Sequence, residues 1–212
     1  MLAGALCVIA ATVAAVQVLL LLDRSLGHPP GWRQAAIPLG FALVAGPFLL
    51  WTLRREGSGR AWLRLRAPVP GTGGRLAWIA ALGMLSMWGV ALACAQFPAY
   101  RRMVEGQVDL GGWHGPAELL RAAFFLGAMP AFFEELYFRG YLLDRLGRHW
   151  GPLGALLAQT ALFAPLHGPA APVAAVLGLL NGTLVLVGGS LWPGMVLHLA
   201  NNLLALAALR VP

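Results

Sequence analysis

Long apolar stretches alternate with short polar segments along the chain. An α-helix needs roughly 20 apolar residues to cross about 30 Å of hydrocarbon, and most of these stretches approach that length. We therefore predict an all-α fold, a polytopic transmembrane bundle of about seven membrane helices. Turns are predicted at 147–152 and 188–190. The predicted helices cover residues 1–22, 35–53, 76–97, 119–146, 153–166, 172–187 and 191–209.

The polar segments between the predicted helices differ in charge. Segment 54–75 is strongly basic, with six arginines against the single acid Glu56. Segment 98–118 carries three acids and two arginines. Because arginines collect in cytoplasmic loops, we predict that 54–75 is a cytoplasmic loop and that 98–118 is a loop on the opposite side. Within the basic loop, Trp62 and Leu65 are candidates for the membrane interface.

The composition supports a membrane location. Hydrophobic residues make up 59% of the 212 residues and charged residues only 11%, whereas soluble proteins carry about 25% charged residues. The net charge is +7 and every basic residue is an arginine, which suggests a GC-rich bacterial genome and an inner-membrane, multi-pass protein. Cytoplasmic arginines explain the basic excess, so no nucleic-acid partner is expected. The sequence shows no repeat, and we predict a single integral-membrane domain over 1–212.

The two cysteines, Cys7 and Cys94, both lie inside apolar stretches. Neither has a neighbouring cysteine or the spacing of a metal-ligand pair. We expect two small buried hydrophobic residues and no disulfide.

Polar side chains interrupt the predicted membrane helices of the C-terminal half. Such groups are costly at membrane depth and persist where they face a cavity or a partner, so each is a functional candidate. The candidates are Glu134, Glu135, Arg139, His167, Asn181, His198, Asn201 and Asn202.

The two adjacent glutamates differ in their helical neighbours. Glu135 and Arg139 are four residues apart, so an α-helix places them on one face, where they can pair. Glu134 is turned by about 100° from Glu135, so no cationic side chain of the same helix shares its face. A carboxylate without such a partner is the candidate general base. The alternative is that this segment is the interfacial end of a helix, where glutamate and arginine are ordinary.

Two histidines lie farther along the chain. His167 follows Pro165, which interrupts its helix and releases backbone carbonyls. His198 and Asn202 are four residues apart and share a helix face. The alternative is that His167 is an interfacial or hydrogen-bonding core residue and that His198 and Asn202 form a packing contact between helices.

Three motifs occur in a fixed order: Glu134-Glu135-x-x-x-Arg139, Phe163-x-x-x-His167 and His198-x-x-x-Asn202. Flanking residues match as well, namely Gly140 after Arg139, and residues 189–193 ahead of His198. Together they resemble the CPBP family of intramembrane proteases, which includes the type II CAAX prenyl endopeptidases. The resemblance covers about residues 119–206, the catalytic core, and leaves the N-terminal helices of 1–97 without an assigned role.

The resemblance implies hydrolysis of a peptide bond by an activated water molecule. Glu134 and His167 would activate the water, and His198 and Asn202 would donate hydrogen bonds to the oxyanion. Glu135 and Arg139 would hold the helix geometry. The implied partners are the lipid bilayer and a membrane-associated protein or peptide, cut near its C-terminus or at the membrane boundary.

A catalytic zinc ion is the alternative to metal-free chemistry. Glu134, His167 and His198 are the residue types of a His₂Glu zinc set. The sequence lacks His-Glu-x-x-His, however, and the better-studied relatives look like glutamate-dependent enzymes. We therefore expect no cofactor and no catalytic metal.

Two other functions are compatible with these residues. Buried glutamate and histidine also mark proton paths, so a proton-coupled transporter is one alternative. Such transporters usually contain paired repeats, which this sequence lacks. A non-catalytic scaffold or immunity protein of the same fold is the other alternative, although all four candidate catalytic side chains are present.

Overall fold

The computed structural model describes residues 2–26, 32–56, 60–105 and 115–208. The chain divides into two compact units. Unit 1 comprises Met1–Arg60, Val108–Tyr137 and Leu199–Pro212, and unit 2 comprises Ala61–Gln107 and Phe138–His198.

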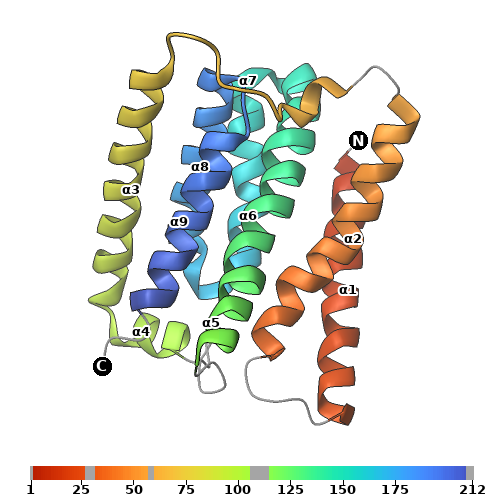
Figure 1. Cartoon of the computed structure of the whole chain (residues 1–212), viewed down its shortest axis with the longest axis vertical. Coiled ribbons are helices and arrows are strands. Elements are labelled where there is room, and N and C mark those ends of the chain that lie inside the picture. Colours follow the sequence, from red (N-terminus) through yellow and green to blue (C-terminus); the bar gives the residue numbers. More distant parts are fainter. Residues whose placement is uncertain (1, 27–31, 57–59, 106–114, 209–212) are drawn as a thin grey trace. The chain divides into compact units, whose positions relative to one another are not determined.

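The described elements are all helical, which confirms the predicted all-α class (Figure 1). Besides the α-helices there are two 3₁₀ segments, η1 and η4, and two π-helical segments, η2 and η3. The elements are α1 (Leu2–Leu26), α2 (Trp32–Glu56), η1 (Arg60–Leu63), α3 (Gly73–Ala95), α4 (Pro98–Glu105), α5 (Pro116–Ala122), η2 (Ala123–Ala128), α6 (Met129–Glu134), η3 (Glu135–Leu142), α7 (Leu143–Phe163), η4 (Ala164–Ala170), α8 (Ala171–Gly188) and α9 (Trp192–Ala208).

Three helical stretches of the described residues are long and apolar enough to cross a membrane, fewer than the seven predicted. They are Ala35–Arg55, Gly73–Ala95 and the 73-residue run Pro116–Gly188; a shorter apolar helix covers Leu6–Leu21. The long run joins three of the predicted helices. Its backbone leaves the helical conformation at Gly151, within the predicted turn, and at Gly168, both with positive φ.

Helix α4 corrects the expectation that 98–118 is a loop. Pro98 starts this helix, as proline often does, because the first helical residue needs no N–H donor within the helix. With eight residues and several charges, this segment is too short and too polar to be predicted as a membrane helix. Nevertheless, α4 packs against the end of α3 and against η4. Burial raises the pKa of the Tyr100 phenol, and the nearby Cys94 adds to the rise.

In unit 1, α1 packs along α2, and α2 packs against η2 and α6. Small residues allow this contact, since a methyl group at Gly40 would lie 2.7 Å from the side chain of Val16. Farther along α2, Phe41 and Phe48 contact the ring of Tyr137 edge-on, with centroids 5.6 and 6.2 Å apart. This aromatic packing fixes the segment that carries the two glutamates against α2.

In unit 2, α8 is the central helix and packs against α3, α7 and η4 (Figure 1). Its glycines make the close approach possible. A methyl group at Gly178 would lie 3.0 Å from Thr160, and one at Gly182 would lie 2.4 Å from Leu156. Glycines four residues apart on a membrane helix commonly mark such a contact face.

Hydrogen bonds attach the basic loop to the turn between α8 and α9. Gly189 ends α8 in the left-handed conformation, with φ of 63°, which confirms the predicted turn. Ser190 donates its hydroxyl hydrogen to the carbonyl of Arg66 at 2.6 Å and accepts the amide N–H of Trp192. The amide of Leu191 donates to the carbonyl of Arg64 at 3.1 Å. These bonds fix the start of α9.

Two sequence predictions about side-chain exposure were wrong. Trp62 does not lie at an interface; it is fully buried and contacts Tyr141 edge-on at 5.7 Å. Gly140 makes room for it, because a methyl group there would lie 3.1 Å from the Trp62 carbonyl oxygen. The cysteines are not buried either, since Cys7 is exposed and Cys94 half-buried, and both are free thiols. Lipid can accept apolar side chains, so an apolar helix need not bury them in protein.

Candidate active site

The segment that carries the glutamates is not a regular α-helix. π-Helical segments flank α6 on both sides, and such wide turns are frequent at functional sites. Pro130, next to the start of α6, lacks the N–H that would bond the carbonyl four residues earlier, which favours an irregular turn. Glu134 is half-buried, whereas Glu135 and Arg139 are fully buried.

The π-helical turn affects the distinction between Glu134 and Glu135, which was based on α-helical spacing from Arg139. The α-helical spacing rule pairs residues four apart, whereas the hydrogen bonds of a π-helix join residues five apart. Arg139 is four residues from Glu135 and five from Glu134. Spacing alone therefore does not separate the two glutamates, and the pairing of Glu135 with Arg139 stays a prediction.

Unit 2 gathers three motif residues around one aromatic ring. The Phe163 ring centroid lies 4.4 Å from that of His167 and 6.4 Å from that of His198. The guanidinium carbon of Arg139 lies 4.0 Å from the same centroid, a cation–π contact. Phe138 contacts the ring edge-on at 5.0 Å. We call these five residues the Phe163 cluster.

The ring orientation of His167 is set by a bond to the backbone. Its Nδ1 lies 3.1 Å from the carbonyl oxygen of Phe163. A carbonyl only accepts, so Nδ1 carries the hydrogen and donates it. In the neutral ring the lone pair is then on Nε2, the nitrogen able to act as a base. Gly168, with φ of 54°, follows directly and turns the chain into α8.

His198 is buried, with 2% of its surface exposed. The side chain of Asn181 on α8 donates from Nδ2 to the carbonyl of Gly194 at 3.3 Å, and Asn181 itself is fully buried. In an α-helix the Gly194 carbonyl also receives the amide N–H of the residue four positions on, which is His198. Asn181 therefore ties α8 to the helical turn that carries His198.

Gln159 and Thr160 are buried polar residues that the sequence reasoning missed. The amide nitrogen of Gln159 donates to the carbonyl of Gly178 at 2.9 Å and to the hydroxyl of Thr160 at 2.7 Å. The bond to Gly178 joins α7 to α8 one turn before Phe163, and the bond to Thr160 lies within α7. The sequence contained a signal for Gln159. A glutamine inside an apolar membrane stretch is a functional candidate by the same rule that selected the histidines.

Asn202 lies in unit 1. Its Nδ2 is 3.5 Å from the carbonyl oxygen of Gly127, and Asn201 is 3.5 Å from its Oδ1. Methyl groups built at Gly127 would meet Leu199 and Leu203, so α9 packs closely on η2 there. The structure thus brings Arg139, His167 and His198 together in unit 2. Glu134, Glu135 and Asn202 belong to unit 1.

The residues of the zinc alternative come from both units, Glu134 from unit 1 and His167 and His198 from unit 2. Among the described residues there is no group of three or more histidine, cysteine, aspartate or glutamate side chains placed to hold a metal ion. The absence of a catalytic metal stays a prediction.

Comparison with known proteins identifies the C-terminal part of the chain. Residues 116–204 match the type II CAAX prenyl endopeptidase Rce1-like family. The chain carries an Rce1-like protease domain. This domain begins with α5, contains all six predicted site residues and confirms the family resemblance seen in the motifs. No curated protein and no solved structure matches the chain. The long apolar helices of the described residues and this family match together indicate a multi-pass membrane protein.

Proposed function

We propose that this protein is an intramembrane endopeptidase of the bacterial inner membrane. It cuts a peptide bond near the C-terminus, or at the membrane boundary, of a membrane-associated protein or peptide. The observation that carries the proposal is the Phe163 cluster, which holds two motif histidines and Arg139 together inside apolar helices. A protease family implies a peptide substrate.

The proposed reaction starts with a water molecule that binds to Glu134 and His167. Glu134 takes one proton of the water while Nε2 of His167 accepts a hydrogen bond from it. The resulting hydroxide attacks the scissile carbonyl carbon and forms a tetrahedral oxyanion. Glu134 then delivers its proton to the departing amine, which breaks the C–N bond and releases both products.

His198 and Asn202 are the proposed donors to the oxyanion. Donors fixed in a water-poor site stabilise a developing charge more strongly than they would in water. α9 runs without a break through both residues, which supports this joint role. The burial of His198 and the bond from Asn181 to its helical turn restrict the motion of the imidazole.

We also propose that the run Pro116–Gly188 crosses the membrane more than once. A straight helix of its 73 residues would be about 110 Å long, well beyond the roughly 30 Å of hydrocarbon. Gly151 and Gly168 are the proposed turning points, since both depart from helical backbone angles. The two units interleave along the sequence, which supports a single integral-membrane domain.

The first test replaces Glu134 by glutamine, which keeps the side-chain size but removes the base. We expect cleavage to fall by about 10²- to 10⁴-fold, the usual contribution of a general base. The measurement compares membrane and secreted peptides of a deletion strain that expresses the native protein or the variant. Glu118→Gln is the matched control, because Glu118 is also half-buried and lies at the start of α5. Native peptide patterns from both Glu134→Gln and His167→Ala would disprove the mechanism.

A further inference from the structure

Unit 2 carries a concentration of arginines at one end of its helices. We call Arg64, Arg66, Arg75, Arg145 and Arg148 the basic surface. The described residues of the three segments that form this end, 61–76, 143–151 and 188–193, include a single acid, Asp144. The surface therefore has a large excess of positive charge.

Contacts join the three segments, so the arginines are held near one another. Asp144 accepts a hydrogen bond from Arg148 at 2.8 Å, and it lies 3.9 Å from Arg64. Arg66 donates from Nε to the carbonyl of Gly189 at 3.2 Å. A methyl group at Gly188 would touch Leu76 at 3.1 Å, which places the start of α3, with Arg75, beside the same turn.

These contacts leave much of the arginine charge exposed. Arg66 and Arg75 are exposed, and the Arg148 side chain is 54% exposed although it pairs with Asp144. Asp144 alone does not neutralise the three exposed arginines Arg66, Arg75 and Arg148. The hydrogen-bonded segments beneath them hold these guanidinium groups on a fixed backbone rather than on a loose loop.

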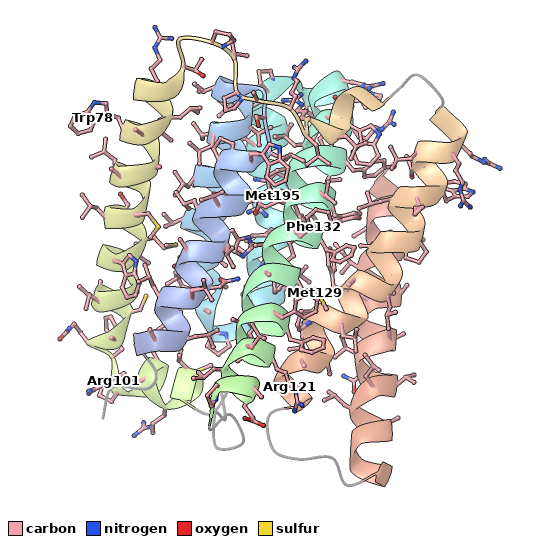
Figure 2. The ribbon with its side chains drawn as sticks, in the orientation of Figure 1. Trp78, Arg101, Arg121, Met129, Phe132 and Met195 are labelled. Atoms are coloured by element: carbon pink, nitrogen blue, oxygen red, sulfur yellow. The ribbon has the colours of Figure 1, made fainter. Side chains whose placement is uncertain are left out.

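Exposed tryptophans mark the same end as a membrane interface. Trp78, Trp150 and Trp192 are 70%, 50% and 47% exposed. Trp78 lies in the second turn of α3, Trp150 is two residues from Arg148, and Trp192 begins α9. Figure 2 shows Trp78 pointing away from the helix, near the end of α3 that joins the basic loop. Tryptophan collects at the headgroup level of a bilayer, so the arginines lie at or just outside that level.

We propose that the basic surface binds the phosphates of anionic phospholipids, such as phosphatidylglycerol. A guanidinium group donates two parallel hydrogen bonds to a phosphate, which suits arginine to this role. Anionic lipid attracts each basic residue near its surface, with an effect of about fivefold in affinity per residue. The lipid would hold the basic loop, the start of α3 and the turn before α9 in place. The proposal does not depend on the proteolytic mechanism.

The test measures lipid binding to the purified full chain in detergent by native mass spectrometry. Phosphatidylglycerol and phosphatidylcholine with the same acyl chains are added in turn. We expect the native protein to retain phosphatidylglycerol preferentially. The triple variant Arg66→Gln, Arg75→Gln, Arg148→Gln should lose at least about tenfold in apparent affinity for it, given the effect of each charge. Inorganic phosphate at millimolar concentration should not displace the lipid.

The matched control is Arg101→Gln, Arg102→Gln on α4. Both arginines are exposed, and Figure 2 shows Arg101 at the opposite end of α3 from Trp78. This variant should bind phosphatidylglycerol as the native protein does. The triple variant Arg66→Lys, Arg75→Lys, Arg148→Lys keeps the charge and should give intermediate binding. It tests the proposal even where the glutamine variant does not fold. Equal binding of the two lipids, equal loss in both sets of variants, or displacement by free phosphate would overturn the proposal.

Discussion

The ring of Phe163 contacts Arg139, His167 and His198, while its own carbonyl accepts the hydrogen of His167 Nδ1. One residue therefore fixes a histidine in two ways, through its ring and through its backbone. The place of Phe163 in the second motif is best explained by this positioning role, because phenylalanine has no group that takes part in hydrolysis.

Phe163→Leu is the prediction that follows at the residue scale. Leucine keeps the carbonyl but removes the ring, so the cation–π and aromatic contacts are lost. We expect a free energy of unfolding lower by about 2 kcal/mol, and at least about tenfold slower cleavage as the histidines lose their alignment. Unfolding in detergent and peptide cleavage measure the two effects. Phe97→Leu is the control, since Phe97 is 66% exposed; similar losses in both variants would contradict the role.

The sequence revealed the motif residues but not their contacts. Spacing placed His198 and Asn202 on one helix face, and α9 is indeed continuous through both. The nitrogen of His167 that carries the hydrogen was not predictable, because it depends on the backbone geometry after Pro165. The Phe163 cluster was not predictable either, because ring contacts between α7, α9 and η3 arise from tertiary packing.

At the scale of elements, glycines decide how closely helices approach. Gly178 and Gly182 face α7, and Gly83 faces Leu180 of α8 from α3. The four-residue spacing of Gly178 and Gly182 was visible in the sequence as a helix-packing signal. The π-helical segments were not visible, because the periodicity analysis assumes a regular α-helix. Only Pro130 pointed to an irregular turn in this region.

Gly178→Ala tests the α7–α8 contact. The new methyl group would lie 3.0 Å from Thr160 and 3.4 Å from the Phe163 ring. Threonine is stiff about χ1, so we expect a loss of about 1–3 kcal/mol in the free energy of unfolding. Gly89→Ala is the same change where no atom lies within 4 Å, and it should stabilise by up to about 1 kcal/mol. Chemical unfolding in detergent compares the two, and an equal effect of both would refute the packing argument.

At the scale of the whole molecule, the chain alternates between the two units. Each unit combines segments that lie far apart in the sequence, so the sequence pattern could not delimit them. The helical stretches were predicted well because apolar length is a local property. The number of membrane crossings stays a prediction, because the run Pro116–Gly188 joins three predicted helices across the kinks at Gly151 and Gly168.

The orientation of α3 gives a prediction at this scale. The basic loop before it should be cytoplasmic and α4 after it should be outside, by the distribution of arginine. In a variant without Cys7 and Cys94, a cysteine at Pro70 should react with a membrane-impermeant maleimide only in inverted vesicles. A cysteine at Ala99 should react in intact cells. Both positions are exposed, and labelling of both from the same side would contradict the orientation.

The interleaving of the units also determines when the protein becomes competent during biosynthesis. Unit 2 needs His198 and unit 1 needs the helix from Leu199 onward, so neither is complete before α9 has been made. Nascent chains that have inserted only α1 to α8 lack both proposed oxyanion donors. Under the proposed mechanism, proteolytic activity would thus arise only after α9 inserts.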